Sequence, residues 1–382
     1  MRQNLSLYIH IPFCVTKCNY CSFVSMPAKD EIKTRYVNCL KKEIALRGKE
    51  FSGGHEVATV YIGGGTPSCL PDGLVKTIMQ EVYKHFVVKN NAEITIEVNP
   101  NTLTKDKVKE YLFAGINRVS MGLQCANNSV LTKMGRLHSA EDFIRCVNLL
   151  KEQGMNNISS DLILGYPNQT LEDVKKSVEL LLKLNIPHIS TYMLSVEDGT
   201  PLQDAIVSKK VALPNEELVV KMYDYCTNTL RNANYERYEV SNFAKPGFRS
   251  KHNQVYWQRQ NYLGLGLAAH SYIAPQRFNN TPDIETYINF LENKNQVPVS
   301  DVKNLTKEEE KEEFIMLSLR MAEGIDVNNY LQRFNENFVS TKKVRLTELI
   351  KNGFLVIDNK TNNIKATDKG FLVLNRIIYE LL

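Results

Sequence analysis

The sequence predicts an α/β protein built from a partial (β/α)6 barrel and a C-terminal, mainly helical, winged-helix-like domain. Three observations carry this prediction. Six short apolar runs alternate with amphipathic stretches between residues 7 and 194, which is the order of parallel strands covered by crossover helices. Polar residues stand at the ends of several runs, where the sites of barrel proteins lie. Residues 302–382 have the order helix, helix, helix, hairpin, helix.

The expected strands and helices of the first part follow from apolar periodicity. A doubly wound sheet would have the same order of elements, and we prefer the barrel because the candidate site residues fall at successive strand ends. The strands are expected at 7–11, 57–63, 93–98, 117–123, 158–164 and 188–194. The helices are expected at 31–48, 72–86, 104–114, 139–153, 170–184 and 215–234.

Local signals mark several helix ends. Ser139 stands three residues before Asp142, and Thr170 stands in the same way before Asp173, which is the spacing of an N-terminal capping box. Gly115 and another glycine at 154 stand where helices should end, because glycine readily adopts the left-handed conformation of a helix C-terminus.

Three domains or segments are expected. Residues 1–235 form the barrel, and 236–301 form a connecting segment, of which 236–273 is rich in Tyr, Asn and Gly and has loop character. The charge-dense stretch 302–313 is the best boundary, and 302–382 form the C-terminal domain. A winged-helix order usually suggests DNA, but this hairpin carries little positive charge, so no nucleic-acid partner is expected.

Composition narrows the functional classes. The 47 Lys and Arg residues exceed the 42 Asp and Glu residues only slightly, and the net charge of +5 suits a mixed surface or one that meets an anionic ligand or membrane. No apolar run is long enough to span a bilayer, and the first residues lack the pattern of a signal peptide. We expect a cytoplasmic protein, with a peripheral position on a membrane as the alternative. Eight cysteines are too few for a disulfide scaffold.

Three cysteines crowd the loop after the first expected strand. Cys14, Cys18 and Cys21 can hold three irons of a 4Fe–4S cluster and leave the fourth iron open for a cosubstrate. Two alternatives stay open: a zinc site completed by a distant histidine, and a redox pair formed by Cys18 and Cys21. The other five cysteines are scattered and are expected to be structural.

The cysteine loop resembles the radical S-adenosylmethionine (SAM) superfamily, whose motif is Cys-x3-Cys-x-aromatic-Cys. Tyr20 supplies the aromatic residue. The resemblance implies that this ring lies against the SAM adenine, while the methionyl amine and carboxylate bind the open iron.

Further residues extend the resemblance to SAM binding. The run "YIGGGTPS" at 61–68 is similar to the family's glycine-rich segment, although a lone glycine run is often only a turn. A single carboxylate in a strand is usually structural, but four polar groups at one edge can bind ribose hydroxyls and polar groups of SAM. The resemblance to coproporphyrinogen oxidase-like enzymes also includes a tyrosine six residues before the first cysteine. The implied SAM-binding residues are Tyr8, Tyr20, Gly64, Gly65, Thr66, Glu97, Gln124, Arg136 and Asp161.

Two departures separate the chain from the true oxygen-independent coproporphyrinogen oxidases, which carry a fourth cysteine where this chain has Phe23. Those enzymes also have a long N-terminal arm, and this chain begins seven residues before Tyr8. The segment 238–257 instead resembles the HemW-type heme chaperones, whose signature His-Asn-x-x-Tyr-Trp is present as residues 252–257. The stretch "GLGLAAHS" at 264–271 follows the same family pattern.

The signature suggests a heme contact. His252 can offer a neutral imidazole to heme iron, and Tyr256 and Trp257 can lie against a porphyrin face. The alternative is a structural His–Asn pair beside two core aromatic residues. His10 and His270 are rival ligands, of which His10 lies on an expected strand and suits the core.

The resemblance implies a heme chaperone that binds heme, carries a SAM-accessible 4Fe–4S cluster and delivers heme to apo-hemoproteins such as respiratory enzymes. A heme donor protein and a second copy of the chain are further candidate partners. One rival function is a radical SAM enzyme acting on a porphyrin-like substrate, either a coproporphyrinogen III oxidase-like dehydrogenase or a heme-modifying methyltransferase. Another is an iron–sulfur regulator. No catalytic residue is assigned, and enzymatic activity stays an open question.

Overall fold

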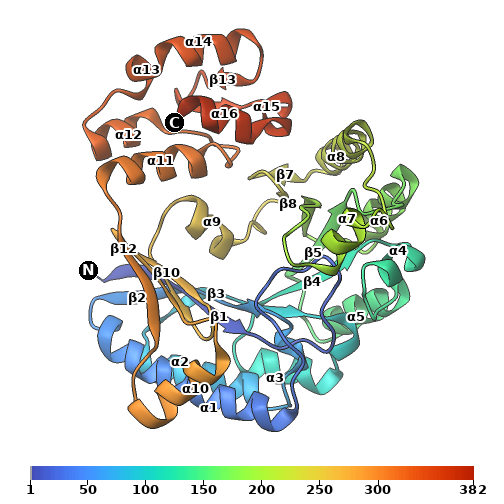
Figure 1. Cartoon of the computed structure of the whole chain (residues 1–382), viewed down its shortest axis with the longest axis vertical. Helices are drawn as coiled ribbons and strands as arrows, with labels where there is room; N and C mark the ends of the chain where they lie inside the picture. Colours follow the sequence, from blue (N-terminus) through green and yellow to red (C-terminus); the bar gives the residue numbers. More distant parts are fainter. Residues whose placement is uncertain (1) are drawn as a thin grey trace.

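One large sheet organises the chain, and the computed structural model describes residues 2–382 of it. Its strands run in the order β12-β11-β10-β9-β1-β2-β3-β4-β5-β6-β8-β7, and β1 to β6 are parallel neighbours (Figure 1). The six expected strands and the partial barrel are confirmed. They are β1 (Gln3–Ile11), β2 (His55–Gly64), β3 (Val88–Val98), β4 (Arg118–Gln124), β5 (Ile158–Leu164) and β6 (His188–Met193).

Helices follow the parallel strands and lie outside the sheet (Figure 1). Both expected capping boxes form, at Ser139 and Thr170, and the two glycines expected at helix ends have φ angles of 84° and 87°. Two short helices, α4 (Asn128–Lys133) and α7 (Pro201–Val207), were not expected. The six expected helices are α1 (Asp30–Phe51), α2 (Leu74–His85), α3 (Lys105–Phe113), α5 (Ala140–Glu152), α6 (Leu171–Lys183) and α8 (Glu216–Asn232).

The two faces of the parallel strands differ in chemistry. On β4 the buried side chains Val119, Met121 and Leu123 belong to the main apolar core. The strand registers place polar residues together on the opposite face, because partners in a parallel ladder share a face. That inner face includes Tyr8, Tyr61, Thr95, Glu97, Ser120, Asp161 and Ser190. A polar inner face surrounded by an apolar outer one is what a site inside the barrel requires.

The stretch 236–273 was expected to have loop character, and the structure instead contains short strands and one helix there. Short strands extend both edges of the sheet, and β9 runs parallel to β1. Runs this short leave little periodicity to read. The added elements are β7 (Glu236–Arg237), β8 (Asn242–Ala244), α9 (Lys251–Trp257), β9 (Tyr262–Leu265), β10 (His270–Ile273), β11 (Gln276–Asn280), α10 (Ile284–Asn289) and β12 (Val299–Asn304).

The C-terminal part has the expected order of three helical segments, a hairpin and a final helical segment, and it has its own core. Phe314, Tyr330, Phe338, Leu349 and Ile377 are buried together there. Its elements are α11 (Lys307–Ser318), α12 (Val327–Phe334), α13 (Phe338–Thr341), α14 (Lys343–Lys351), β13 (Leu355–Ile357), β14 (Ile364–Ala366), α15 (Asp368–Leu372) and α16 (Leu374–Leu381).

A charged network joins this C-terminal part to the sheet, and α9 lies between the two (Figure 1). The guanidinium of Arg259 is buried and lies 3.1 Å from Glu313 and 3.6 Å from Glu310, both on α11. Arg277 on β11 binds Glu313 at 2.7 Å. Separately, no helix within residues 2–382 combines the length and apolar character needed to cross a lipid bilayer.

Candidate cluster and cofactor site

The three predicted cluster ligands lie together in the loop between β1 and α1. Cys14, Cys18 and Cys21 are free and partly exposed. The Cys21 amide donates to the Cys18 carbonyl at 3.2 Å, so the last two share a tight turn. Burial raises the pKa of the Cys21 thiol. Phe23, in place of a fourth cysteine, is 66% exposed.

The glycine-rich turn after β2 is hydrogen-bonded to the start of the cysteine loop. The Gly65 amide donates to Ile11 O at 2.8 Å, and the Thr66 amide donates to Phe13 O at 2.7 Å. The Thr66 hydroxyl lies 3.6 Å from the sulfur of Cys14. The turn and the cysteine loop therefore form one backbone unit at the carboxyl end of the barrel, where sites of this fold lie.

Two glycines of this turn are required by the protein's own packing. A Cβ atom at Gly65 would lie 2.6 Å from Phe13 O, which is closer than non-bonded atoms approach. At Gly64 a Cβ atom would lie 2.5 Å from the His10 ring, and its φ of +114° also favours glycine. The sequence predicted a ligand approach at these glycines, and in the structure the close approaches are made by His10 on β1 and by Phe13 in the cysteine loop.

Glu97 holds the other side of the turn. Its carboxylate accepts hydrogen bonds from the Tyr61 hydroxyl at 2.8 Å and the Gly64 amide at 3.1 Å. Burial, with the nearby Asp161 carboxyl, raises the pKa of Glu97 to about 7. Sequence reasoning missed Tyr61, although a tyrosine alternating with apolar residues on a strand is a signal for an inward polar side chain.

Arg136 and Gln124 leave buried polar atoms without partners within residues 2–382. Arg136 lies 3.6 Å from the sulfur of Cys18 and 3.4 Å from Gly122 O, but its Nε has no partner. Gln124 has a left-handed φ of 64°, and its Oε1 has no partner. Unpaired buried polar groups are costly, so an incoming polar ligand would satisfy them.

Of the other predicted SAM-binding residues, Tyr8 and Asp161 lie on the inner face, and Tyr20 lies in the cysteine loop. Asp161 is the strand partner of Gly122, and burial raises its pKa. Tyr8 bonds His10 through its hydroxyl at 2.9 Å, and Tyr20 packs edge-on against Tyr166. A small cleft at the mouth is lined by Val15, Thr16, Cys18, Thr66, Asn99, Gly135, Arg136 and Leu137.

The signature histidine lies deeper in the barrel. His252 is fully buried, and its two ring nitrogens bond Thr59 Oγ1 at 2.7 Å and the Tyr256 hydroxyl at 2.8 Å. It also stacks on Tyr61, and burial lowers its pKa to about 3. In this arrangement the neutral imidazole has no nitrogen free for iron. The structural alternative had paired His252 with Asn253, and neither ring nitrogen bonds that residue.

The backbone of the signature segment is fixed to the sheet. The amides of Lys251 and His252 donate to the Glu93 carboxylate at 3.1 and 3.0 Å, so α9 begins on β3. Thr59 and Glu93 are strand partners one layer below Tyr61. The segment therefore closes the barrel on the amino side of that layer, and heme contact by His252, Tyr256 and Trp257 stays a prediction.

The remaining histidines differ in accessibility. His10 and His188 are buried with both ring nitrogens hydrogen-bonded, and His138 is buried with its pKa lowered to about 4. His55 bonds Phe51 O through one nitrogen, and His85 lies 3.2 Å from Glu81. His270, at the start of β10, is the one exposed histidine of residues 2–382.

Comparison with known proteins agrees with this geometry. Residues 8–181 match the radical SAM superfamily, and residues 305–373 match the HemN C-terminal domain. The protein is 34% identical to the heme chaperone HemW of Lactococcus lactis over 99% of this chain and 97% of that one. It is 32% identical to HemW of Bacillus subtilis over 97% of both chains. This chain belongs to the HemW family of radical SAM proteins.

A solved structure shows the same fold. The HemW-family chain superposes on Escherichia coli coproporphyrinogen III oxidase (HemN) with a TM-score of 0.85 and 24% identity, covering all of this chain and 90% of that one. Membership in the radical SAM superfamily implies SAM and a 4Fe–4S cluster. The residues present fit both groups: the loop of free thiols is hydrogen-bonded to the glycine-rich turn, Arg136 lies beside Cys18, and Arg136 and Gln124 each keep an unpaired buried polar atom.

Replacing Gly65 with alanine should disturb the cysteine loop, because the new Cβ atom would meet Phe13 O. After anaerobic reconstitution the wild-type chain should hold about four irons, and Gly65→Ala should hold less than half of that. Gly53→Ala is the matched control, since nothing lies within 4 Å of its Cβ position. Full iron loading of Gly65→Ala would contradict the packing argument.

The raised pKa of Glu97, about 7 against an ordinary 4.5, predicts a pH effect on the cluster-free protein. Between about pH 4.5 and pH 7 the carboxyl keeps a proton in the folded protein that it releases in the unfolded protein, so the free energy of unfolding falls as the pH rises. The fall is at most about 1.4 kcal/mol per pH unit, the limit for one proton. Urea unfolding at several pH values in this range gives the free energy of unfolding as a function of pH. The decrease with pH should be shallower for Glu97→Gln than for the wild type, while Glu152→Gln, at an exposed position, should keep the wild-type decrease. Equal slopes for Glu97→Gln and wild type would show that Glu97 is ionised throughout.

Proposed function

We propose that this protein is a heme chaperone that carries a SAM-accessible 4Fe–4S cluster and delivers heme to apo-hemoproteins. The observation that carries the proposal is the similarity to HemW chaperones along essentially the whole chain, 34% over 99% of its length. Fold alone would not carry it, because related folds host different functions. The site geometry adds support, since the cysteine loop and the glycine-rich turn are hydrogen-bonded to each other at the carboxyl end of the barrel.

Cys14, Cys18 and Cys21 are the proposed cluster ligands. Across the described chain, no three His, Cys, Asp or Glu side chains converge as ligands of one metal ion do. Three thiolates that each bind a different iron need no such convergence. The cluster, when bound, supplies an open iron for the SAM methionyl group and an electron for SAM chemistry.

The chain's own residues have separable roles around that cluster. The guanidinium of Arg136, 3.6 Å from the Cys18 sulfur, stabilises negative charge there. The turn at Gly64–Thr66 offers backbone groups, and Glu97 offers a carboxylate that the turn already contacts. Tyr20 offers an aromatic edge, and Asp161 and Gln124 offer polar groups to the rest of SAM.

Exposure makes His270 the best-placed histidine for an iron that must later be handed over. The loop that leads into His270 is anchored from beneath, because the buried Glu43 accepts hydrogen bonds from Gly266 N at 2.8 Å and from Asn280 Nδ2 at 2.6 Å. A rigid loop that presents an exposed imidazole suits a ligand shared with an acceptor. His252 would have to break two buried hydrogen bonds to bind iron.

The proposed partners are heme and apo-hemoproteins such as respiratory enzymes, with a heme donor and a second copy of the chain as further candidates. The proposed location is the cytoplasm, with peripheral membrane contact as the alternative. An enzyme acting on a porphyrin-like substrate is the rival function, and it predicts multiple turnovers of coproporphyrinogen III with SAM and reductant.

Heme titration should separate the histidines. Trp257 is the only tryptophan, so its emission reports a nearby heme by energy transfer. His270→Ala should shift the Soret band and weaken binding, whereas the exchange His55→Ala should change neither. His252→Ala should instead lower stability by about 2 kcal/mol, because it removes two buried hydrogen bonds, one to Thr59 and one to Tyr256. A Soret shift in folded His252→Ala, with none in His270→Ala, would place the ligand at His252.

Heme transfer tests the proposed function directly. The heme-loaded, cluster-loaded chain is mixed with an apo-b-type cytochrome, and the acceptor's reduced spectrum is followed. We expect near-stoichiometric transfer of heme to the acceptor. This transfer should be faster than transfer from hemin bound to albumin. Multiple turnovers of coproporphyrinogen III under the same anaerobic conditions, without transfer, would favour the enzyme instead.

A further inference from the structure

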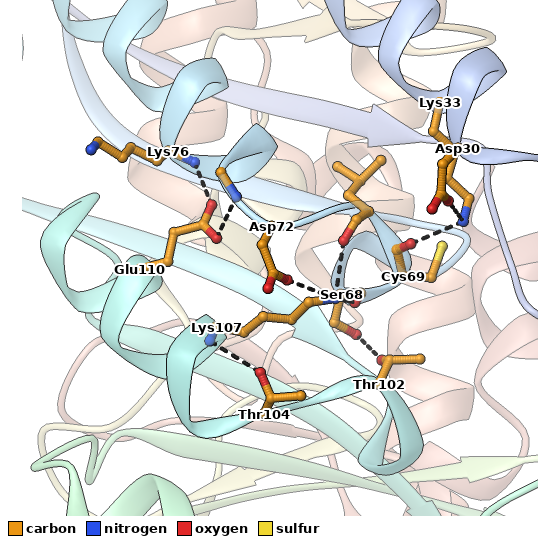
Figure 2. Close-up of polar contacts among 12 residues, drawn as sticks. Asp30, Lys33, Ser68, Cys69, Asp72, Lys76, Thr102, Thr104, Lys107 and Glu110 are labelled. Carbon is orange, nitrogen blue, oxygen red and sulfur yellow. Dashed lines mark hydrogen bonds and ion pairs between the residues drawn. The ribbon is translucent and has the colours of Figure 1, made fainter.

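Two lysines from different helices converge on the backbone that directly follows the glycine-rich turn (Figure 2). Lys107 on α3 donates from Nζ to Ser68 O at 2.5 Å and to Leu70 O at 3.0 Å. Lys33 on α1 donates to Cys69 O, the carbonyl between them, at 3.1 Å. The ammonium groups of Lys33 and Lys107 therefore bind the three consecutive carbonyls of residues 68–70 and together form a lysine clamp.

The position of Lys107 is electrostatically unfavourable for a lysine. It lies in the first turn of α3, where the helix dipole disfavours a cation. Its side chain is only 12% exposed, and desolvation lowers its pKa. The nearest carboxylate, Asp72, is 3.8 Å away and mostly exposed. The contacts that compensate this cost are the two backbone carbonyls.

Neighbouring groups make the lysine clamp rigid. The short 3-10 helix η1 (Pro67–Cys69) contains Ser68, whose buried hydroxyl bonds Thr102 Oγ1 at 2.6 Å and accepts the Asn99 amide at 2.9 Å. Glu110, on the same helix as Lys107, accepts the amides of Gly73 at 2.8 Å and Lys76 at 2.9 Å (Figure 2). Helix α3 therefore fixes the chain at 68–70 and again at the start of α2.

The lysine clamp and the cysteine loop bind opposite ends of the short segment that follows the glycine-rich turn. Thr66 is bonded to Phe13 O, and Ser68, two residues later, is bonded to Lys107. The thiol of Cys69 also donates to Phe13 O at 3.4 Å, so this cysteine, expected only to be structural, belongs to the same junction. With both ends fixed, the backbone groups at 64–66 have little freedom to move away from the loop.

We propose that Lys107, assisted by Lys33, is a positioning residue for SAM: it holds the glycine-rich turn in the geometry that receives the methionyl group. It acts through the backbone of residues 68–70 and does not itself contact the ligand. The inference rests on the proposed SAM site and adds residues that lie outside the cysteine loop and the glycine run.

The test uses the full-length chain with its cluster reconstituted anaerobically. Lys107→Met keeps the apolar stem and removes the ammonium group, and Lys107→Arg keeps the charge. Lys109→Met is the control on the same helix, because Lys109 is exposed and pairs with the exposed Asp106 at 3.7 Å. Three quantities are measured: iron content, SAM dissociation constant, and the change that SAM causes in the EPR spectrum of the reduced cluster.

For Lys107→Met we expect unchanged iron content, a SAM dissociation constant raised about tenfold, and a weakened EPR response. Lys107→Arg should recover part of the affinity, and Lys109→Met should match the wild type. Hydrogen exchange without SAM should be faster at amides 64–70 in Lys107→Met alone. Faster exchange confined to this segment separates positioning from a general loss of stability.

Wild-type SAM affinity and EPR response in Lys107→Met would overturn the inference, as would lost affinity with unchanged exchange at 64–70. If Lys107→Met fails to fold, Lys33→Met decides, since it removes only the contact with Cys69 O and the exposed Asp30. We expect about threefold weaker SAM binding for it, and unchanged binding would overturn the inference. A wild-type chain that loads iron but binds no SAM would reject the proposed SAM site itself.

Discussion

The pairing of the glycine-rich turn with the cysteine loop is the contact on which the rest of the site depends. It continues the β1–β2 ladder beyond the strands, through Gly65 N to Ile11 O and Thr66 N to Phe13 O. The turn is bonded to the start of the cysteine loop on one side and to Glu97 on the other. The pairing therefore fixes where the cysteine loop starts relative to Glu97. A side chain at residue 65 would occupy the place of a carbonyl, so glycine there is a requirement of the backbone.

The polar inner face gives the barrel a second constraint. Arg118 is 1% exposed within it, and burial together with the nearby Asp161 carboxyl raises the pKa of Glu97. Such a face is stable only where its groups find partners or ligands. At the lower layer the partners come from the protein, since His252 satisfies Thr59 and Glu93 binds the α9 backbone. At the upper layer, Gln124 and Arg136 keep unpaired atoms for a ligand.

Much of this architecture could be predicted from the sequence, because the six parallel strands and their helices carry long periodic patterns and strong caps such as Ser139. The cysteine spacing and the glycine run likewise pointed to two segments that hydrogen bonds join in the structure. The short strands of 236–301 escaped prediction because pairing with β1 and β6, rather than local pattern, forms them. The environment of His252 depends on Thr59, 193 residues away, and the Lys107 clamp depends on carbonyls that every residue possesses.

The central claim is that the cysteine loop and the adjoining turn bind a cluster and SAM as one site. Electron–nuclear double resonance of the reduced, cluster-loaded chain tests it most directly, with SAM labelled by magnetic isotopes at the methionyl amine and carboxylate. The account predicts hyperfine couplings large enough to require direct bonding of both groups to one iron. Absence of such couplings in a sample shown to have bound SAM would contradict it, because SAM would then lie away from the open iron.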